Sequence, residues 1–214
     1  MSASVTVVDY GIGNILSVSR ALEHCGAKVL LTDLPAQIAQ AQRVVLPGVG
    51  AFKDGMDGLR ERGLIDAVKQ FAASGRPLLG ICLGMQMLLE FSEEFGVHEG
   101  LGLIPGRVAA IPATTADGLP HKIPHIGWNE LNFTAGTTDW RGTILEDVSP
   151  GNAVYFVHSF TAQPADIRHR LADCDYNGRL VAAAIRSGMV YGCQFHPEKS
   201  GNVGLRILKS FLAT

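Results

Sequence analysis

The sequence predicts an α/β fold with a mostly parallel central sheet flanked by helices and an antiparallel C-terminal half. In the first hundred residues, short β-branched or leucine-rich runs alternate with longer amphipathic runs, which is the order of βα units. Runs such as VVL and PLLGI are apolar throughout, as strands buried on both faces are. From about residue 106, short strands separated by glycine and proline replace that pattern.

The expected elements follow in chain order. A strand at residues 5–9 precedes a helix at 14–25, which we expect Asn14 to cap. The rest of the first half is expected to hold strands at 28–32, 43–46 and 77–81 and helices at 56–74 and 85–95. Residues 112–125 read as a surface loop. The second half is expected to hold strands at 107–111, 127–133, 153–160 and 168–175, a hairpin of 180–186 and 189–195 about Ser187-Gly188, and a helix at 202–212.

The composition is that of an ordinary globular protein, and we expect a single domain over residues 1–214. A formal net charge of −2 gives no field that would attract nucleic acid. No signal peptide or membrane-spanning run is recognisable, so a cytoplasmic protein without a membrane role is expected. The sequence contains no CxxC pair, so neither a metal site nor a disulfide is expected. Three of the four cysteines are expected in the core, namely Cys25, Cys174 and Cys193.

The fourth cysteine, Cys82, occupies a Gly-x-Cys-x-Gly frame between an apolar strand and a helical run. This is the pattern of a nucleophile elbow, in which a sharp turn holds the nucleophile in strained dihedral angles. Gly80 and Gly84 supply the room that such a turn needs. The thiol would lie at a helix N-terminus, which favours the thiolate, and the amide of Leu83 is expected to donate to an oxyanion.

A thiol nucleophile needs a base and a group that orients the base. His196 follows an expected strand, and Pro197 ends that strand so that Glu198 can turn back toward the imidazole. We expect Glu198 to accept the Nδ1 proton and leave Nε2 facing Cys82. For His158 two interpretations stay open, a buried hydrogen-bonded histidine and a residue that lines a pocket.

The second oxyanion donor is expected in the loop after the strand at 43–46. The run Pro47-Gly48-Val49-Gly50 opens at the carboxyl end of a parallel strand, where open sheets bind ligands. Gly50 is the candidate amide. A plain turn at the strand exit is the alternative.

Residues 47–50, 80–86 and 196–198 together resemble the class I, or triad, glutamine amidotransferase family in order and spacing. More narrowly, residues 9–14, 47–52, 124–129 and 155–159 look like the glutaminase subunits of imidazole glycerol phosphate synthases, and this resemblance spans nearly the whole chain. The triad alone leaves anthranilate, guanylate, carbamoyl phosphate and pyridoxal phosphate systems open. The GWN and YFVHS segments favour the histidine pathway. Phe160 departs from the pattern, since many members have tyrosine there.

The resemblance implies that Cys82, His196 and Glu198 hydrolyse L-glutamine to glutamate and ammonia without a cofactor or metal. It implies glutamine binding by Gly50 and by Gln86, Ser159 and Phe160. It also implies a heterodimer with a (β/α)₈-barrel cyclase subunit, which uses the ammonia to make imidazole glycerol phosphate and AICAR. A barrel needs about 250 residues, so this chain of 214 cannot contain it as well. The residues that match family positions near the cyclase are Trp128, Tyr155 and Lys199.

Two other functions compete with this one. A cysteine peptidase or γ-glutamyl hydrolase built on the same elbow would act on peptides or polyglutamates without a partner. A catalytically silent interaction subunit would keep the fold but would not react with a glutamine-like electrophile at Cys82. The glutaminase subunit of another amidotransferase also remains an alternative.

Overall fold

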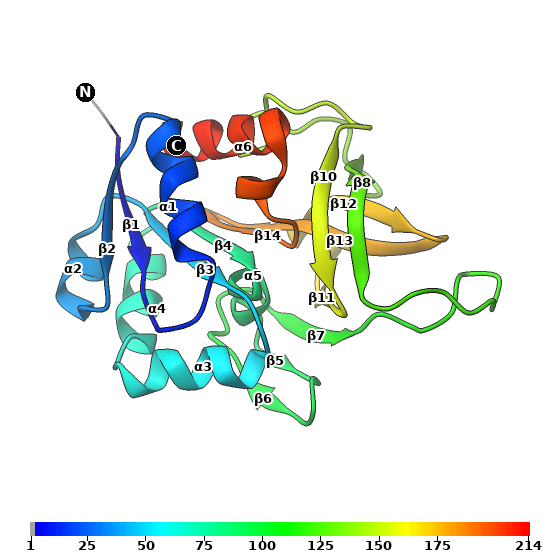
Figure 1. The fold of residues 1–214 in the computed structure, drawn as a ribbon, viewed down its shortest axis with the longest axis horizontal. Helices are drawn as coiled ribbons and strands as arrows, with labels where there is room; N and C mark the ends of the chain where they lie inside the picture. The colour runs from blue at the N-terminus through cyan, green and yellow to red at the C-terminus, as the bar shows by residue number, and fades with distance from the viewer. Residues whose placement is uncertain (1–2) are drawn as a thin grey trace.

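A computed structural model describes residues 3–214 and has an eight-stranded sheet at its centre, in the order β2-β1-β3-β4-β14-β13-β12-β9 (Figure 1). In that order the strands are Lys28–Thr32, Ser4–Val8, Val44–Gly48, Leu78–Cys82, Val190–Cys193, Arg179–Ser187, Arg170–Tyr176 and Asn132–Phe133. Neighbours from β2 to β14 pair in parallel, and the remaining pairs are antiparallel. The predicted fold class, parallel in the first half and antiparallel in the second, is confirmed.

Helices cover both faces of the parallel strands. One face packs against α1 (Ile15–His24) and α6 (Gly201–Ala213), whose Leu22 and Phe211 share a buried cluster with Val45 of β3. On the other face, Leu46 of β3 belongs to a cluster with residues of the remaining helices. Those helices are α2 (Pro35–Gln40), α3 (Phe52–Glu61), α4 (Ile65–Ala73) and α5 (Leu83–Met87). Burial on both faces explains why these strands read as continuous apolar runs.

Two smaller sheets stand beside the main one. The first pairs β10 (Ala153–His158) with β8 (His125–Glu130), and the two strands lie side by side in Figure 1. The second has the order β11-β7-β5-β6, formed by Phe160–Pro164, Gly106–Ala110, Phe91–Ser92 and His98–Glu99. Short 3₁₀ turns, η1 (Ile167–His169) and η2 (Pro197–Lys199), complete the elements. The predicted strand at 153–160 is therefore two strands that separate at Ser159 and enter different sheets.

The helix predicted at 56–74 is two helices, α3 and α4. Gly63 between them has a φ of +64°, and the chain changes direction there. The break follows from the left-handed conformation that a glycine adopts readily at a helix end. The helix α2 was not predicted, and neither were β5 and β6.

The helix predicted at 85–95 ends at Met87 as α5. The carbonyls of Met87, Leu88 and Leu89, which a longer helix would use internally, accept the amides of Leu101, Leu103 and Gly102 at 2.8 to 3.0 Å. Because this pairing comes from a later segment, the local apolar pattern could not reveal it. No helix in residues 3–214 is long and apolar enough to cross a membrane.

Candidate active site

Cys82 ends β4 and is the N-cap residue of α5, in a strained conformation with φ +54° and ψ −110°. Its flanking glycines permit the turn. A Cβ on Gly84 would lie 1.8 Å from the carbonyl oxygen of Leu46, and a Cβ on Gly80 would lie 2.6 Å from the carbonyl oxygen of Gly84. Both positions therefore require glycine, and the bend has the strained dihedral angles that the sequence predicts for an elbow.

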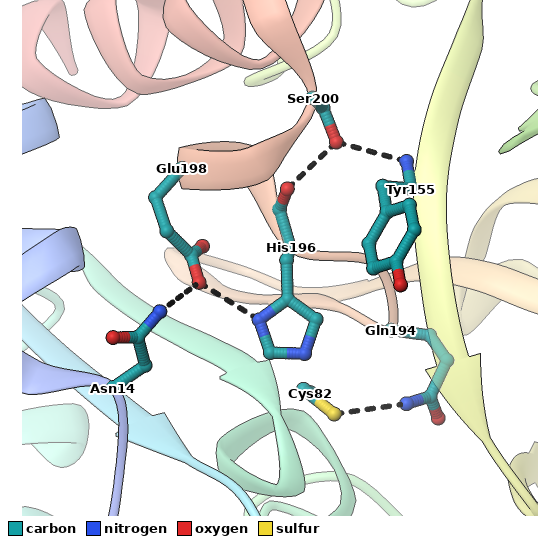
Figure 2. A network of polar contacts seen from close by, with 7 residues as sticks. All are labelled: Asn14, Cys82, Tyr155, Gln194, His196, Glu198 and Ser200. Carbon is teal, nitrogen blue, oxygen red and sulfur yellow. Dashed lines mark hydrogen bonds and ion pairs between the residues drawn. The ribbon is translucent and has the colours of Figure 1, made fainter. Parts of the chain in front are cut away.

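His196 follows β14, the strand that pairs directly with β4. Its backbone amide donates to the carbonyl of Tyr155 at 3.0 Å, which fixes the residue against β10. Figure 2 shows the sulfur of Cys82 beside the imidazole, on the side of Nε2. Within the described part of the chain, buried Nε2 has no hydrogen-bond partner, so it is available to a reacting group.

Glu198 lies in η2 and orients the imidazole. His196 Nδ1 donates to Glu198 Oε1 at 2.8 Å, as the sequence predicts, and both side chains are buried. The same carboxylate oxygen accepts from Asn14 Nδ2 at 3.4 Å (Figure 2). The expectation that the Asn14 side chain caps α1 is wrong: Asn14 occupies the cap position but makes no side-chain cap bond.

The protonation of His196 reflects two opposing influences. Burial lowers the pKa of its imidazole, but interactions with Cys82 and Glu198 outweigh that effect and raise the pKa to about 9. His196 is therefore an imidazolium at neutral pH. A proton held on this ring is available to a leaving group at Cys82.

A cavity of about 300 Å³ opens in front of Cys82. It brings together all the residues expected to bind glutamine or stabilise an oxyanion, with Cys82 and His196. From the predicted set, its lining holds Gly50, Leu83, Gln86, Ser159 and Phe160. The remaining lining residues are Val49, Glu94, Phe95, Val157 and His158.

Two glutamine side chains connect the wall of the cavity with the sulfur of Cys82. Gln86 Nε2 donates to the carbonyl of Phe160 at 3.1 Å and to Gln194 Oε1 at 3.0 Å. Gln194 Nε2 in turn donates to the sulfur of Cys82 at 3.7 Å. Gln194 was not among the predicted site residues. The available signal was its position two residues before His196 at the end of the strand predicted at 189–195, because alternate residues of a strand face the same side.

His158 fits both interpretations left open by the sequence. It lines the cavity, and its buried ring is bonded at both nitrogens: Nδ1 donates to the Phe160 carbonyl at 2.7 Å, and Nε2 accepts from His125 Nδ1 at 2.9 Å. Burial lowers the pKa of His158 to about 3, and burial likewise lowers the pKa of His125 to about 4. Both rings are neutral at physiological pH. The carbonyl can only accept, so His158 carries its proton on Nδ1 and accepts at Nε2.

The loop that holds Gly50 is fixed at one end by a carboxylate. Glu94 Oε2 accepts from the amide of Phe52, the first residue of α3, at 2.6 Å. Gly50 itself has φ +95° and open space where a Cβ would stand. Glu94 was not predicted at this site, because the apolar pattern of residues 85–95 indicates a single helix.

The residues expected at a partner interface lie around the strand β10. Tyr155 pairs in register with Trp128 of β8, and their rings meet edge to face with centroids 6.2 Å apart. Trp128 is 58% exposed, and Lys199 is also exposed. The amide of Tyr155 donates to the hydroxyl of Ser200, next to Lys199, at 3.0 Å, so this surface is bonded to the segment that holds His196 (Figure 2). Within residues 3–214, no group of three or more His, Cys, Asp or Glu side chains could hold a metal ion.

Comparisons with known proteins agree with this geometry. The family model for glutamine amidotransferase class-I matches residues 6–214. Imidazole glycerol phosphate synthase subunit HisH 1 of Legionella pneumophila (strain Lens) is 56% identical over 210 residues, which cover 98% of this chain and 99% of the relative. The subunit HisH of Geobacillus sp. (strain WCH70) is 47% identical over 207 residues, covering 97% and 95%.

Among solved structures, PurLQS from Thermotoga maritima superposes with a TM-score of 0.75 at 21% identity, covering 100% of this chain and 99% of that one. A structure described as a glutamine amidotransferase gives a TM-score of 0.72 at 17% identity, covering 98% and 99%. These likenesses support the fold. With the family match and the close relatives, they show that the chain belongs to the class-I glutamine amidotransferase family.

Proposed function

We propose that the chain is the glutaminase subunit of an imidazole glycerol phosphate synthase, with Cys82, His196 and Glu198 as its catalytic residues. The chemistry rests on one observation: beside the sulfur of Cys82, an imidazole is oriented by its hydrogen bond to Glu198. The acceptor pathway rests on the full-length similarity to relatives that bear this name. The four cysteines are free thiols, which suits the reducing cytoplasm.

In the first half-reaction, the thiolate of Cys82 attacks the carboxamide carbon of L-glutamine. The carbonyl oxygen becomes an oxyanion, and the backbone amides of Leu83 and Gly50 stabilise it by donating hydrogen bonds. The carbon–nitrogen bond then breaks, and the departing nitrogen takes the proton of the His196 imidazolium and leaves as ammonia. The product on the enzyme is a γ-glutamyl thioester.

In the second half-reaction, water attacks the thioester while His196, now neutral, accepts a proton from it. The carbon–sulfur bond breaks, glutamate leaves, and the thiolate and imidazolium are restored. Glu198 keeps the proton of Nδ1 in place throughout and stabilises the charged ring. Neither half-reaction requires a metal or cofactor.

The cavity has groups suited to the amino-acid end of glutamine. Gln86 uses its amide nitrogen on Phe160 and Gln194, which leaves its Oε1 to accept from the substrate ammonium. The carboxylate of Glu94 also lines the cavity and suits a positive charge. Ser159 and the backbone at Phe160 complete the wall on the side of β10 and β11.

The ammonia acceptor belongs to a second subunit, a cyclase with a (β/α)₈ barrel that forms a heterodimer with this chain. The surface of Trp128, Tyr155 and Lys199 is the proposed docking face. It lies next to the segment that carries His196, because the Tyr155 carbonyl accepts the His196 amide. Docking there would bring the partner close to the departing ammonia and would let it adjust the site.

The test is ammonia release from glutamine by the purified chain, alone and with the cyclase and its nucleotide substrate. Slow hydrolysis alone, strong activation by the complete complex and formation of imidazole glycerol phosphate are expected. Cys82→Ala should abolish activity, whereas Cys193→Ala, a change in a buried core thiol, should not. Turnover of peptides or polyglutamates without a partner, or unchanged activity in Cys82→Ala, would refute the proposal.

A further inference from the structure

Gln194 is a fully buried amide in an apolar environment. Its neighbours Cys193 and Phe195 are also without solvent exposure. Burying a carboxamide costs free energy unless its polar atoms are bonded, so the partners of this one indicate what it does. Both of its side-chain partners, Cys82 and Gln86, belong to the proposed active site.

The direction of this hydrogen-bond chain is fixed by the carbonyl of Phe160. A carbonyl can only accept, so it holds the amide nitrogen of Gln86 toward itself at 3.1 Å. The second N–H of that nitrogen then meets Gln194 Oε1 at 3.0 Å. The amide nitrogen of Gln194 must therefore face the sulfur of Cys82, at 3.7 Å. A single orientation of both amides satisfies all three contacts.

We infer that Gln194 is a positioning residue that holds the sulfur of Cys82 and the substrate-binding amide of Gln86 in one fixed relation. Its N–H donates to the sulfur and restrains the position of the sulfur. Its Oε1 accepts a hydrogen bond from one N–H of Gln86. This bond fixes the Gln86 amide so that its side-chain oxygen stays free to accept from the ammonium of glutamine. This inference rests on the proposed glutaminase function for the role of Gln86, but not for the contact with the thiol.

Two substitutions separate these roles. Gln194→Met keeps the volume but removes both bonds, so KM for glutamine should rise about tenfold, the effect of one lost hydrogen bond. Alkylation of Cys82 by iodoacetamide at pH 7 should also slow by a few fold. Gln194→Glu keeps an oxygen for Gln86, so KM should return to within about twofold of the wild type. Gln163→Met, an exposed position on β11 that bonds Arg107, is the matched control and should change neither value.

Melting temperature is measured for every variant, and assays use the chain both alone and with its cyclase. A purely structural role would reduce stability and active fraction in both Gln194 variants and leave KM and the alkylation rate per active site unchanged, which would overturn the inference. Equal KM increases in the Met and Glu variants would also overturn it. Absence of glutaminase activity in the wild type would refute the proposed function instead, and the alkylation rates would still test the contact with Cys82.

Discussion

Cys193 of β14 pairs in parallel register with Ile81 of β4. The two strands end within one residue of each other, so Cys82, the last residue of β4, and His196, three residues after β14, meet at the carboxyl edge of the sheet, where open parallel sheets hold their ligands. The antiparallel second half thus contributes one parallel strand to the first half, and that strand brings His196 to Cys82. This placement determines how activity should depend on pH and on substitutions at the site.

The first prediction concerns pH. Cys82 and Glu198 raise the pKa of His196 above its ordinary value, to about 9. The proton that ammonia needs is present below this pH and is lost as pH rises through it, so kcat/KM should fall above about pH 9. Glu198→Gln removes the carboxylate charge and should move this fall to lower pH, toward the ordinary histidine value of about 6.5.

The measurement is the pH profile of kcat/KM for glutamine in both proteins. Glu23→Gln, an exposed change on α1, is the control and should leave the profile unmoved. An alkaline fall at the same pH in wild type and Glu198→Gln would show that the carboxylate does not set the protonation of His196.

The second prediction concerns Asn14. Its Nδ2 shares Glu198 Oε1 with His196 and does not line the cavity, so it should restrain the carboxylate without binding substrate. Asn14→Ala should lower kcat about threefold, as expected for one long hydrogen bond, and leave KM unchanged. Since Asn14 makes no side-chain cap bond to α1, the melting temperature should also stay the same. A fall in melting temperature with unchanged kcat would mean that Asn14 serves the helix instead.

The third prediction contrasts two glycines. A Cβ at Gly84 would collide with the Leu46 carbonyl, so Gly84→Ala should destabilise the fold by about 3 kcal/mol. At Gly50 a Cβ meets open space, and only the φ of +95° opposes alanine, so Gly50→Ala should cost about 1 kcal/mol. Alanine keeps the backbone amide but disfavours the φ of +95° that orients it, so if this amide is an oxyanion donor, its misplacement should lower kcat by up to about a hundredfold.

Urea denaturation and glutaminase assays on the two variants provide the measurement. The expected pattern is an unstable Gly84→Ala protein and a folded but slow Gly50→Ala protein. A folded Gly50→Ala protein with wild-type kcat would show that catalysis does not depend on the left-handed backbone conformation at residue 50.

The sequence predicted those features that local chemistry determines. A buried strand followed by Gly-x-Cys-x-Gly dictates the strained turn at Cys82, and the His-Pro-Glu order permits the bond between His196 and Glu198. The apolar runs predicted the parallel strands because burial on both faces leaves no alternation. In each case the residues that cause the feature lie within a few positions of it.

The features that were missed depend on distant partners. The helix after Cys82 is short because a segment more than ten residues later takes its last carbonyls. That early end releases Glu94 to bond Phe52 and face the cavity. The side chain of Asn14 bonds Glu198, which lies 184 positions later in the chain, and makes no cap bond to its own helix. Such choices between competing partners are decided by tertiary packing and leave no local signal.

The last prediction concerns Trp128. This side chain is 58% exposed on β8, packs edge to face on Tyr155 and does not line the cavity. An exposed tryptophan at the centre of an interface typically contributes about 2 kcal/mol or more to binding. Trp128→Ala should therefore weaken cyclase binding by about thirtyfold, measured by calorimetric titration, and leave hydrolysis by the chain alone unchanged. Leu180→Ala, a change of similar exposure on β13, is the control for a general loss of surface apolar area. Unchanged cyclase affinity in Trp128→Ala, or an equal loss in Leu180→Ala, would move the docking surface away from the β8–β10 pair.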